Sequence, residues 1–281
     1  MSKQRLFLIT GTNKGIGYGL VERLLSSEKN SLVLMTSRSV PRGKEAFTKL
    51  AQAYPQEKDR LIYQQLDISS KESVDNFLSW LRNSYGKVDF LINNAAVGDR
   101  AQFENPNAPI SPDKIEETMN VNFFSTVLFT EKMLPFLSDT GKIITLTTLL
   151  ATLQYQKEPI RRFLSNPNIT LEELFKKAEE FEELAYKGEH VAHGYSPRIY
   201  DVSKVLLNCY VRWILAKKMK ESQGCFLVEP GWVKTEMGGS QAPMSVQEGT
   251  NSAWRAIHFD RDQTRKFNGK FIDSKGNELS F

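Results

Sequence analysis

Short apolar runs alternate with segments of helical periodicity along this chain. Residues 6–9 form an apolar run that ends at Thr10 and Gly11, which is typical of a buried strand. Residues 16–25 then repeat apolar side chains at helical spacing. The same patterns predict strands at residues 6–10, 31–36, 61–66, 88–92, 142–147, 225–228 and 271–272. They predict helices at residues 16–25, 43–54, 71–85, within 112–137, and at 201–221.

Repeated strand–helix units predict a parallel sheet with helices on both faces. The length of 281 residues suits one large domain, and no repeat, low-complexity tract or linker divides the chain. We therefore expect an α/β fold, a single doubly wound parallel sheet of about seven strands that spans residues 1–281.

Residues 151–199 interrupt the alternation, because they are too many for a plain connection. Within them Thr170 and Glu173 form a predicted capping box, and apolar side chains follow at helical spacing. We expect a helical insertion before the helix that begins near Tyr200. Such an insertion either builds a substrate wall, blocks an oligomer interface or is a passive surface excursion.

Composition excludes several classes of protein. The net charge of +4 is too small to indicate a nucleic-acid partner. No apolar run approaches the ~18 residues of a membrane span, and the N-terminal residues lack the pattern of a signal peptide. Cys209 and Cys225 are too few for a disulfide framework, so two free thiols in a reducing compartment are expected. These features predict a cytoplasmic location and no membrane contact.

A glycine-rich turn over residues 10–17 follows the first strand and opens the first helix. Gly11 permits the tight turn, Gly15 lets the backbone approach a pyrophosphate, and Gly17 lets the helix pack against the strand. The helix N-terminus adds N–H donors for the phosphate. This context predicts a dinucleotide site of the Rossmann type. The residues expected to contact the coenzyme here are Gly11, Asn13, Lys14, Gly15, Ile16 and Gly17.

The end of the second predicted strand indicates which coenzyme binds. An NAD site needs an acid there, whereas an NADP site needs cations for the 2′-phosphate. The strand ends in Ser37 and Arg38 with no acid, and Lys14 stands in the glycine-rich turn. Arginine binds phosphate bidentately and lysine adds a point charge. We therefore predict NADP(H).

Tyr200 and Lys204 lie four residues apart, which places them one turn apart on one helix face. A neighbouring ammonium favours phenolate, so the tyrosine pKa is expected to fall below its usual value of ~10. A tyrosine tuned in this way is suited to protonate a carbonyl oxygen. An isolated pair of this kind also occurs on solvated helix faces, so the rest of the chain decides its meaning.

Six motifs occur together: residues 10–17, 66–68 (Leu-Asp-Ile), 93–96 (Asn-Asn-Ala-Ala), 122–124 (Asn-Phe-Phe), 200–204 and 230–235 (Pro-Gly-Trp-Val-Lys-Thr). In this order and spacing the chain resembles a short-chain dehydrogenase/reductase over nearly its whole length. The Asn-Phe-Phe and Pro-Gly-Trp-Val strings and the long insertion resemble the carbonyl reductase branch. In that branch the insertion is associated with a monomer.

The resemblance implies a role for each matching position. Tyr200 would donate the proton, Lys204 would bind the nicotinamide ribose and lower the tyrosine pKa, and Asn122 would support a water-linked proton path. Asp67 would contact the adenine unless it only caps a helix, and Trp232 would be core, pocket wall or both. The remaining implied coenzyme contacts are Ile68, Asn94, Ala95, Ala96, Pro230, Gly231, Val233 and Thr235.

The chain departs from the family pattern at three positions. Thr148 takes the place of the catalytic serine; it keeps a hydroxyl for the substrate carbonyl, but its methyl crowds the pocket. Ala96 replaces the last glycine of Asn-Asn-Ala-Gly beside the coenzyme. Glu229 precedes Pro230, where it is either exposed or an acid at the site entrance.

We expect NADPH-dependent reduction of apolar or aromatic ketones, aldehydes or quinones, with a pocket wall formed by Trp232, Met237 and the insertion. The alternatives are a dedicated pterin or steroid reductase and a non-enzymatic NADP(H)-binding sensor. The expected partner is a small carbonyl compound bound by a monomer. His190 and His193 lack an evident third ligand, so no metal site is predicted.

Overall fold

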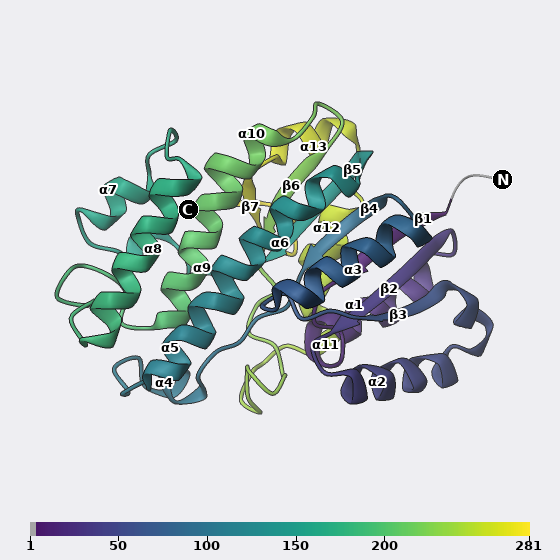
Figure 1. Ribbon diagram of the computed structural model, residues 1–281, viewed down its shortest axis with the longest axis horizontal. Coiled ribbons are helices and arrows are strands. Elements are labelled where there is room, and N and C mark those ends of the chain that lie inside the picture. The colour runs from purple at the N-terminus through teal and green to yellow at the C-terminus, as the bar shows by residue number, and fades with distance from the viewer. Residues whose placement is uncertain (1–3) are drawn as a thin grey trace.

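The computed structural model describes residues 4–281, and a single sheet organises them (Figure 1). Its strands are β1 (Arg5–Ile9), β2 (Ser31–Ser37), β3 (Leu61–Gln65), β4 (Val88–Asn93), β5 (Leu137–Leu146), β6 (Gly224–Val228), β7 (Lys270–Ile272) and β8 (Glu278–Leu279). They lie in the order β3-β2-β1-β4-β5-β6-β7-β8, and only β8 runs antiparallel to its neighbour. The predicted α/β class is confirmed, with one strand more than the seven expected. The extra strand is too short to leave a period in the sequence.

Long and short α-helices connect these strands. They are α1 (Gly15–Ser27), α2 (Val40–Ala53), α3 (Lys71–Ser84), α4 (Arg100–Glu104), α5 (Pro112–Met119), α6 (Thr126–Met133), α7 (Ile160–Leu164), α8 (Leu171–Tyr186), α9 (Ile199–Cys209), α10 (Ala216–Lys218), α11 (Val246–Gly249), α12 (Asn251–Ile257) and α13 (Arg261–Phe267). Short 3₁₀ segments cover Pro55–Arg60, Leu134–Phe136 and Leu153–Tyr155.

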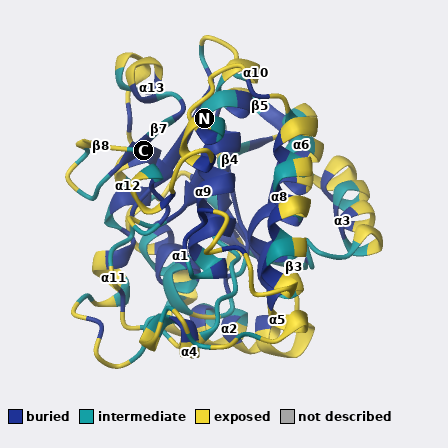
Figure 2. Ribbon diagram, turned by 90° about the vertical axis from the view of Figure 1, so that its left-hand side faces the viewer, coloured by how far each residue is buried: buried dark blue, intermediate teal, exposed yellow. Residues whose placement is uncertain are grey.

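Two apolar layers hold the helices against the sheet. Along β1, Leu6 and Leu8 face a core shared with α3, α5, α6, α8 and α9. Phe7 and Ile9 face the opposite core, which contains α1, α2, α12 and α13. This alternation follows from the two-residue period of a strand. Figure 2 shows the central strands and α9 mostly in the buried colour, with exposed residues on the outer faces of the surrounding helices.

The two long helices predicted from the sequence are each interrupted by a π-helical turn. Asn120–Ser125 separates α5 from α6, and Tyr210–Leu215 separates α9 from α10. The first helix also ends earlier than the predicted range, because β5 already begins at Leu137. Such turns often mark functional sites, and the first of them contains Asn122.

The insertion carries α7 and α8 and packs on one side of the sheet. The capping box forms as predicted: the Thr170 hydroxyl accepts from the Glu173 N–H at 3.2 Å, and the Glu173 carboxylate accepts from the Thr170 N–H at 2.8 Å. Phe175 then meets Phe123 and Phe124 edge-on, with ring centroids 5.6 and 5.4 Å away. The insertion is therefore fastened to the segment that carries Asn122.

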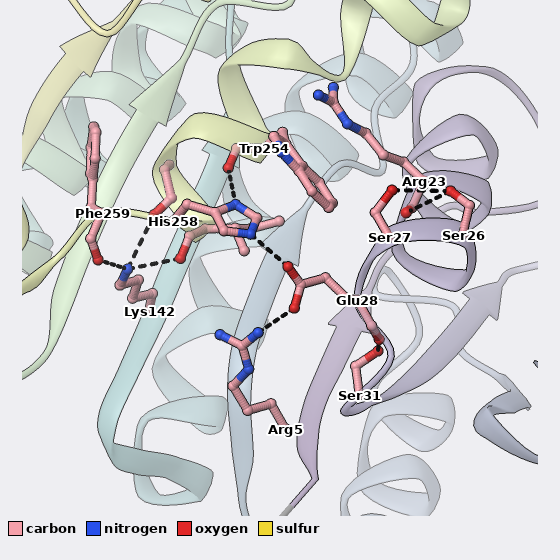
Figure 3. A network of polar contacts seen from close by, with 12 residues as sticks. Arg5, Arg23, Ser26, Ser27, Glu28, Ser31, Lys142, Trp254, His258 and Phe259 are labelled. Atoms are coloured by element: carbon pink, nitrogen blue, oxygen red, sulfur yellow. Dashed lines mark hydrogen bonds and ion pairs between the residues drawn. The ribbon is translucent and has the colours of Figure 1, made fainter.

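A polar network ties the amino ends of the strands to the helices (Figure 3). Glu28, at the end of α1, binds Arg5 of β1 and the Nε2 of His258, the latter at 2.6 Å. Lys142 of β5 donates to the carbonyls of Ile257 and Phe259 at 2.9 and 2.6 Å, which satisfies the end of α12. Burial lowers the pKa of Lys142 to about 8. These bonds close the amino ends of the strands, while the carboxyl ends remain open and form a cleft.

Cys209 and Cys225 are free, buried thiols, as predicted. No helix among residues 4–281 is both long and apolar enough to cross a bilayer.

Candidate active site

A cleft of about 650 Å³ opens at the carboxyl ends of the six strands β1 to β6. This is where ligands bind in open parallel sheets. The predicted site residues that line it are Gly11, Asn13, Lys14, Gly15, Ile16, Arg38, Asp67, Ile68, Asn94, Ala95, Ala96, Tyr200, Lys204, Pro230 and Thr235. The predicted site residues outside its lining are Gly17, Ser37, Asn122, Thr148, Gly231, Trp232 and Val233. The two halves of the predicted site, far apart in sequence, therefore share one cavity.

Two side chains hold the glycine-rich turn against the end of β4: the Thr10 hydroxyl accepts from the N–H groups of Asn94 and Ala95, both at 3.0 Å. The Asn94 amide donates to the carbonyls of Thr10 and Gly11 at 2.8 and 3.0 Å. A Cβ at Gly17 would lie 2.4 Å from the Asn94 Nδ2, so only glycine allows this approach. Gly15 has a φ of +62°, which also favours glycine. Gly17 thus packs behind the cleft, while Gly15 presents its backbone to it.

Cations gather where the 2′-phosphate of a coenzyme was expected. Lys14 pairs with Glu236, and Arg38 lies 3.6 Å from Glu117. Three further cations in the lining were not predicted from the sequence, namely Arg42, Arg100 and Lys114. Arg42 has a detectable signal, since it follows Arg38 by four residues and lies in the first turn of α2. The predicted Ser37 is turned away, because its hydroxyl donates to the Ser39 carbonyl at 3.0 Å.

Asp67 lies in the cleft beside Ile68 and does not cap a helix. Its Oδ1 accepts from the N–H and the hydroxyl of Ser69 at 3.0 and 2.6 Å. The N-cap of α3 is Ser70, whose hydroxyl accepts from the Ser73 N–H. The capping interpretation of Asp67 is therefore wrong, because the N-cap of α3 lies three residues later, at Ser70.

Tyr200 and Lys204 lie on α9, whose other residues are all buried. The Lys204 Nζ is 5.9 Å from the centre of the Tyr200 ring and donates to the Leu146 carbonyl at 3.1 Å. Phe103 of α4 covers the tyrosine ring edge-on, with ring centroids 5.0 Å apart. Both members of the pair thus face the cleft from a rigid, packed element.

The electrostatics of this pair differ from the prediction. Burial, followed by the charges of Glu229 and Asp201, raises the pKa of Tyr200. Burial also lowers the pKa of Lys204 to about 8. The predicted fall in the tyrosine pKa is therefore wrong. Desolvation and the charges of two acids raise it, and the neighbouring lysine does not offset them.

Thr148 and Asn122 lie close to the cleft, but their side chains are engaged elsewhere. The Thr148 hydroxyl accepts from the Leu150 N–H at 3.2 Å. The Asn122 amide bonds both backbone groups of Val97, at 2.9 and 2.8 Å, and donates to the Ser203 hydroxyl at 3.1 Å. Asn122 therefore fixes the loop after β4 to α9, and Val97 of that loop lines the cleft.

With this geometry in place, the chain can be compared with known proteins. The profile of the short chain dehydrogenase family matches residues 5–159. The chain belongs to this family. The predicted family is confirmed, and the chain is an oxidoreductase.

Relatives in this family support the carbonyl reductase branch. The chain is 32% identical over 260 residues to carbonyl reductase (NADPH) 1 of Sus scrofa, covering 89% of this chain and 86% of the relative. It is 30% identical over 258 residues to the Homo sapiens protein of the same name, covering 87% of each.

Solved structures show the same fold. Salutaridine reductase from Papaver somniferum has a TM-score of 0.84 at 24% identity, over 95% of this chain and 99% of that one. An NADPH-bound carbonyl reductase from chicken fatty liver has a TM-score of 0.71 at 21% identity, over 99% and 100%.

The loop after β6 departs from what the family resemblance suggested. Trp232 is 57% exposed, and its indole N–H donates to the Gly238 carbonyl at 2.8 Å. Met237 lines the cleft, but neither Trp232 nor any residue of the insertion does. The predicted wall is therefore wrong in two of its three parts, because the indole turns outward and α8 packs against α5 and α9 instead.

His190 and His193, which lie three residues apart in the insertion, each bond a backbone carbonyl. His190 bonds the Pro197 carbonyl and His193 bonds the Glu189 carbonyl, at 3.1 and 3.0 Å. Within residues 4–281 no group of three or more His, Cys, Asp or Glu residues is placed to hold a metal ion.

Proposed function

We propose that this protein reduces carbonyl compounds to alcohols with NADPH, with Tyr200 as the proton donor. The observation that carries the proposal is that Tyr200 and Lys204 open into the same cleft as the glycine-rich turn. A module that only binds a coenzyme has no need of a phenol that opens into the cleft at this place. The names of the related carbonyl reductases support the same activity.

The residues of the cleft fit NADP(H). Gly15 lets the backbone approach a pyrophosphate, and the N-terminus of α1 offers N–H donors to it. Lys14, Arg38 and Arg42 would hold the 2′-phosphate, for which Glu117 and Glu236 must release their partners. Asp67 and Ile68 would hold the adenine end. The amide of Asn94 and the methyls of Ala95 and Ala96 would lie along the middle of the coenzyme.

The coenzyme, when bound, supplies the hydride that the carbonyl carbon receives. Tyr200 transfers its proton to the carbonyl oxygen, so that hydride and proton together give the alcohol. Its raised pKa keeps the phenol protonated before the reaction. Lys204 would bind the ribose and stabilise the phenolate that remains until a solvent proton replaces the one transferred. Thr148 would hold the carbonyl oxygen once its hydroxyl turns away from Leu150.

The substrate end of the cleft favours apolar or aromatic ketones, aldehydes and quinones. Val97 and Met237 line it, and Phe103 lies against Tyr200. Apolar walls with a few polar groups are typical of sites for such ligands.

One observation favours a second candidate, an NADP(H)-binding protein without turnover. The only hydroxyl available at the usual serine position, that of Thr148, is bonded to the backbone and lies outside the cleft lining. The deciding experiment measures NADPH oxidation against a panel of quinones, aldehydes, ketones, pterins and steroids. Turnover of apolar carbonyls supports the reductase, and turnover of one pterin or steroid alone supports a dedicated reductase. Tight NADPH binding without oxidation across the panel supports the sensor.

We also propose that the protein is a cytoplasmic monomer. The insertion supports a monomer, because its helix α8 packs on α5 and α9 and so occupies a face that a second subunit would otherwise use. Size-exclusion chromatography with light scattering tests it, and a dimer mass would contradict it.

A further inference from the structure

Glu229 places a buried carboxyl behind the floor of the cleft. The residue is 8% exposed and directly precedes Pro230, which lines the cleft together with Tyr200. Its Oε1 accepts from the Gly231 N–H at 2.8 Å. Its Oε2 is buried and has no hydrogen bond of ordinary geometry among the described residues, although the Leu149 N–H lies close enough to lower the pKa of the carboxyl. A buried carboxyl oxygen without a donor is costly when charged, so this side chain needs an explanation beyond packing.

The backbone around Glu229 is fixed. Its N–H donates to the Ile272 carbonyl at 3.0 Å, and the Thr147 N–H donates to the Val228 carbonyl at 3.0 Å. These bonds join the end of β6 to β7 and to the end of β5. The carboxyl is therefore held in place by its own strand, and its position does not depend on a flexible loop.

The charged and titratable groups around this carboxyl are few. From α9 they are Tyr200, Asp201 and Lys204. Asp201 is bonded to Ser196 and Arg198, and Lys204 donates to Leu146. The segment after β5 brings no charged group: the Leu149 N–H lies near the carboxyl, and the Thr147 N–H bonds the Val228 carbonyl. Beyond β7, the Asp273 carboxylate is bonded to Asn277. On its own loop Lys234 follows, and Glu236 pairs with Lys14.

Among residues 4–281 no cation pairs with Glu229, and its charge acts on Tyr200. A negative charge on Glu229 raises the pKa of the Tyr200 phenol. Burial in turn raises the pKa of Glu229 to about 7, against the opposing backbone hydrogen bonds from Gly231 and Leu149. The carboxyl therefore changes charge within the range where enzymes are usually assayed.

We propose that Glu229 is a positioning residue that sets the pH range of carbonyl reduction, because its charge opposes proton release by Tyr200. The inference rests on the proposed function. With Glu229 protonated, the phenolate left by proton transfer has no anion behind it. With Glu229 ionised, two negative charges would share a poorly solvated site, which slows the reduction.

The test compares wild type with Glu229→Gln. Glutamine keeps an oxygen for the Gly231 N–H and removes only the charge. We expect the ratio of kcat/KM, variant over wild type, to be near one well below pH 7. It should rise to roughly tenfold above pH 8, with the Kd for NADPH unchanged. Using the ratio removes the contribution of Lys204, which titrates in both proteins.

Two further variants complete the design. Glu172→Gln removes a carboxylate from the exposed face of α8 and should leave the ratio at one at every pH. Glu229→Met also removes the acceptor for the Gly231 N–H, so it shows how much kcat/KM depends on that hydrogen bond rather than on the charge. Carbon-13 NMR of labelled glutamate should find a carboxyl that titrates near pH 7 in wild type and is absent from Glu229→Gln.

The outcomes are distinguishable. A ratio that rises with pH, with the matching NMR titration, supports the inference. Measurable turnover with a ratio that does not change with pH overturns it and leaves the proposed function intact. A carboxyl that is already ionised at pH 5 also overturns it. Wild type without carbonyl reduction at any pH ends the proposed function and the inference with it.

Discussion

The ring of Phe103 meets the ring of Tyr200 edge-on, at 5.0 Å between centroids and 71° between planes. The contact joins α4 to α9, and two further hydrogen bonds support it. Gln102 accepts from the Ile199 N–H at 3.1 Å through its side chain and from Arg198 through its carbonyl. The short helix α4 therefore caps the first turn of α9 and covers the proposed proton donor.

Phe103→Ala should weaken catalysis without weakening coenzyme binding. An aromatic pair of this kind contributes ~0.5–1.5 kcal/mol, so we expect kcat/KM to fall by up to roughly tenfold while the Kd for NADPH is unchanged. Phe103→Leu is the matched control, because it keeps apolar cover and should recover part of the loss. Equal kcat/KM in wild type and Phe103→Ala would show that the contact does not position Tyr200.

Tyr200→Phe should remove turnover and leave the coenzyme site intact. The substitution deletes only the hydroxyl, and proton donation of this kind contributes ~10²–10⁴ in rate. Steady-state kinetics should show that loss, while fluorescence titration gives an NADPH Kd close to that of wild type. Near-normal turnover in the variant would exclude Tyr200 as the acid.

Two substitutions of Thr148 separate the contribution of its methyl from that of its hydroxyl. Thr148→Ser keeps the hydroxyl and removes the methyl, so a severalfold gain in kcat or a wider range of ketones is expected. Thr148→Ala removes a neutral hydrogen bond worth ~0.5–1.5 kcal/mol, which predicts a loss of up to about tenfold. If neither variant changes kcat or substrate range, the hydroxyl takes no part in the reaction.

The cations of the cleft should determine coenzyme preference. A charge-assisted hydrogen bond contributes ~1.5–3 kcal/mol, so Arg38→Ala and Arg42→Ala should each raise the Kd for NADPH by roughly ten- to a hundredfold. The Kd for NADH should barely change, because it lacks the 2′-phosphate. Arg162→Ala, on the exposed face of α7, serves as the control. A wild-type preference for NADH would contradict the assignment.

Glu229 also makes stability depend on pH. Its pKa rises from 4.5 unfolded to about 7 folded, so the folded state keeps a proton that the unfolded chain has lost. The free energy of unfolding therefore starts to fall as pH rises above 4.5, and this loss of stability is complete above about 7. Because each unit of pKa shift corresponds to ~1.4 kcal/mol, the loss of stability reaches up to about 3 kcal/mol. Thermal unfolding of Glu229→Gln should therefore match wild type at pH 4.5 and exceed it at pH 8. A constant difference in Tm between the two proteins across this range would contradict the buried titration.

Much of the fold was predictable because it repeats locally. Each parallel strand is an apolar run that ends at a turn, and each long helix has an apolar stripe. The capping box of α8 was read directly from Thr170 and Glu173. The two π-helical turns and β8 were not predictable, because they leave no period that differs from an ordinary helix or loop.

The candidate site was predictable where a motif recurs at fixed spacing. The glycine-rich turn and the pair Tyr200 and Lys204 were found in this way, and both line the cleft. Arg42 could have been found from its spacing to Arg38. Phe103 carried no signal, because its contact with Tyr200 joins residues far apart in sequence.

The sequence alone determined the alternating elements, the family and the side chains available for chemistry, because these depend on residue type and near-neighbour spacing. The tertiary structure decided which of those side chains meet and how well water reaches them. Trp232 turns outward and Glu229 is enclosed, although both lie in the same short loop region. The pKa of Tyr200 rises where its neighbour Lys204 alone predicted a fall, since desolvation and long-range charges depend on packing that local sequence does not encode.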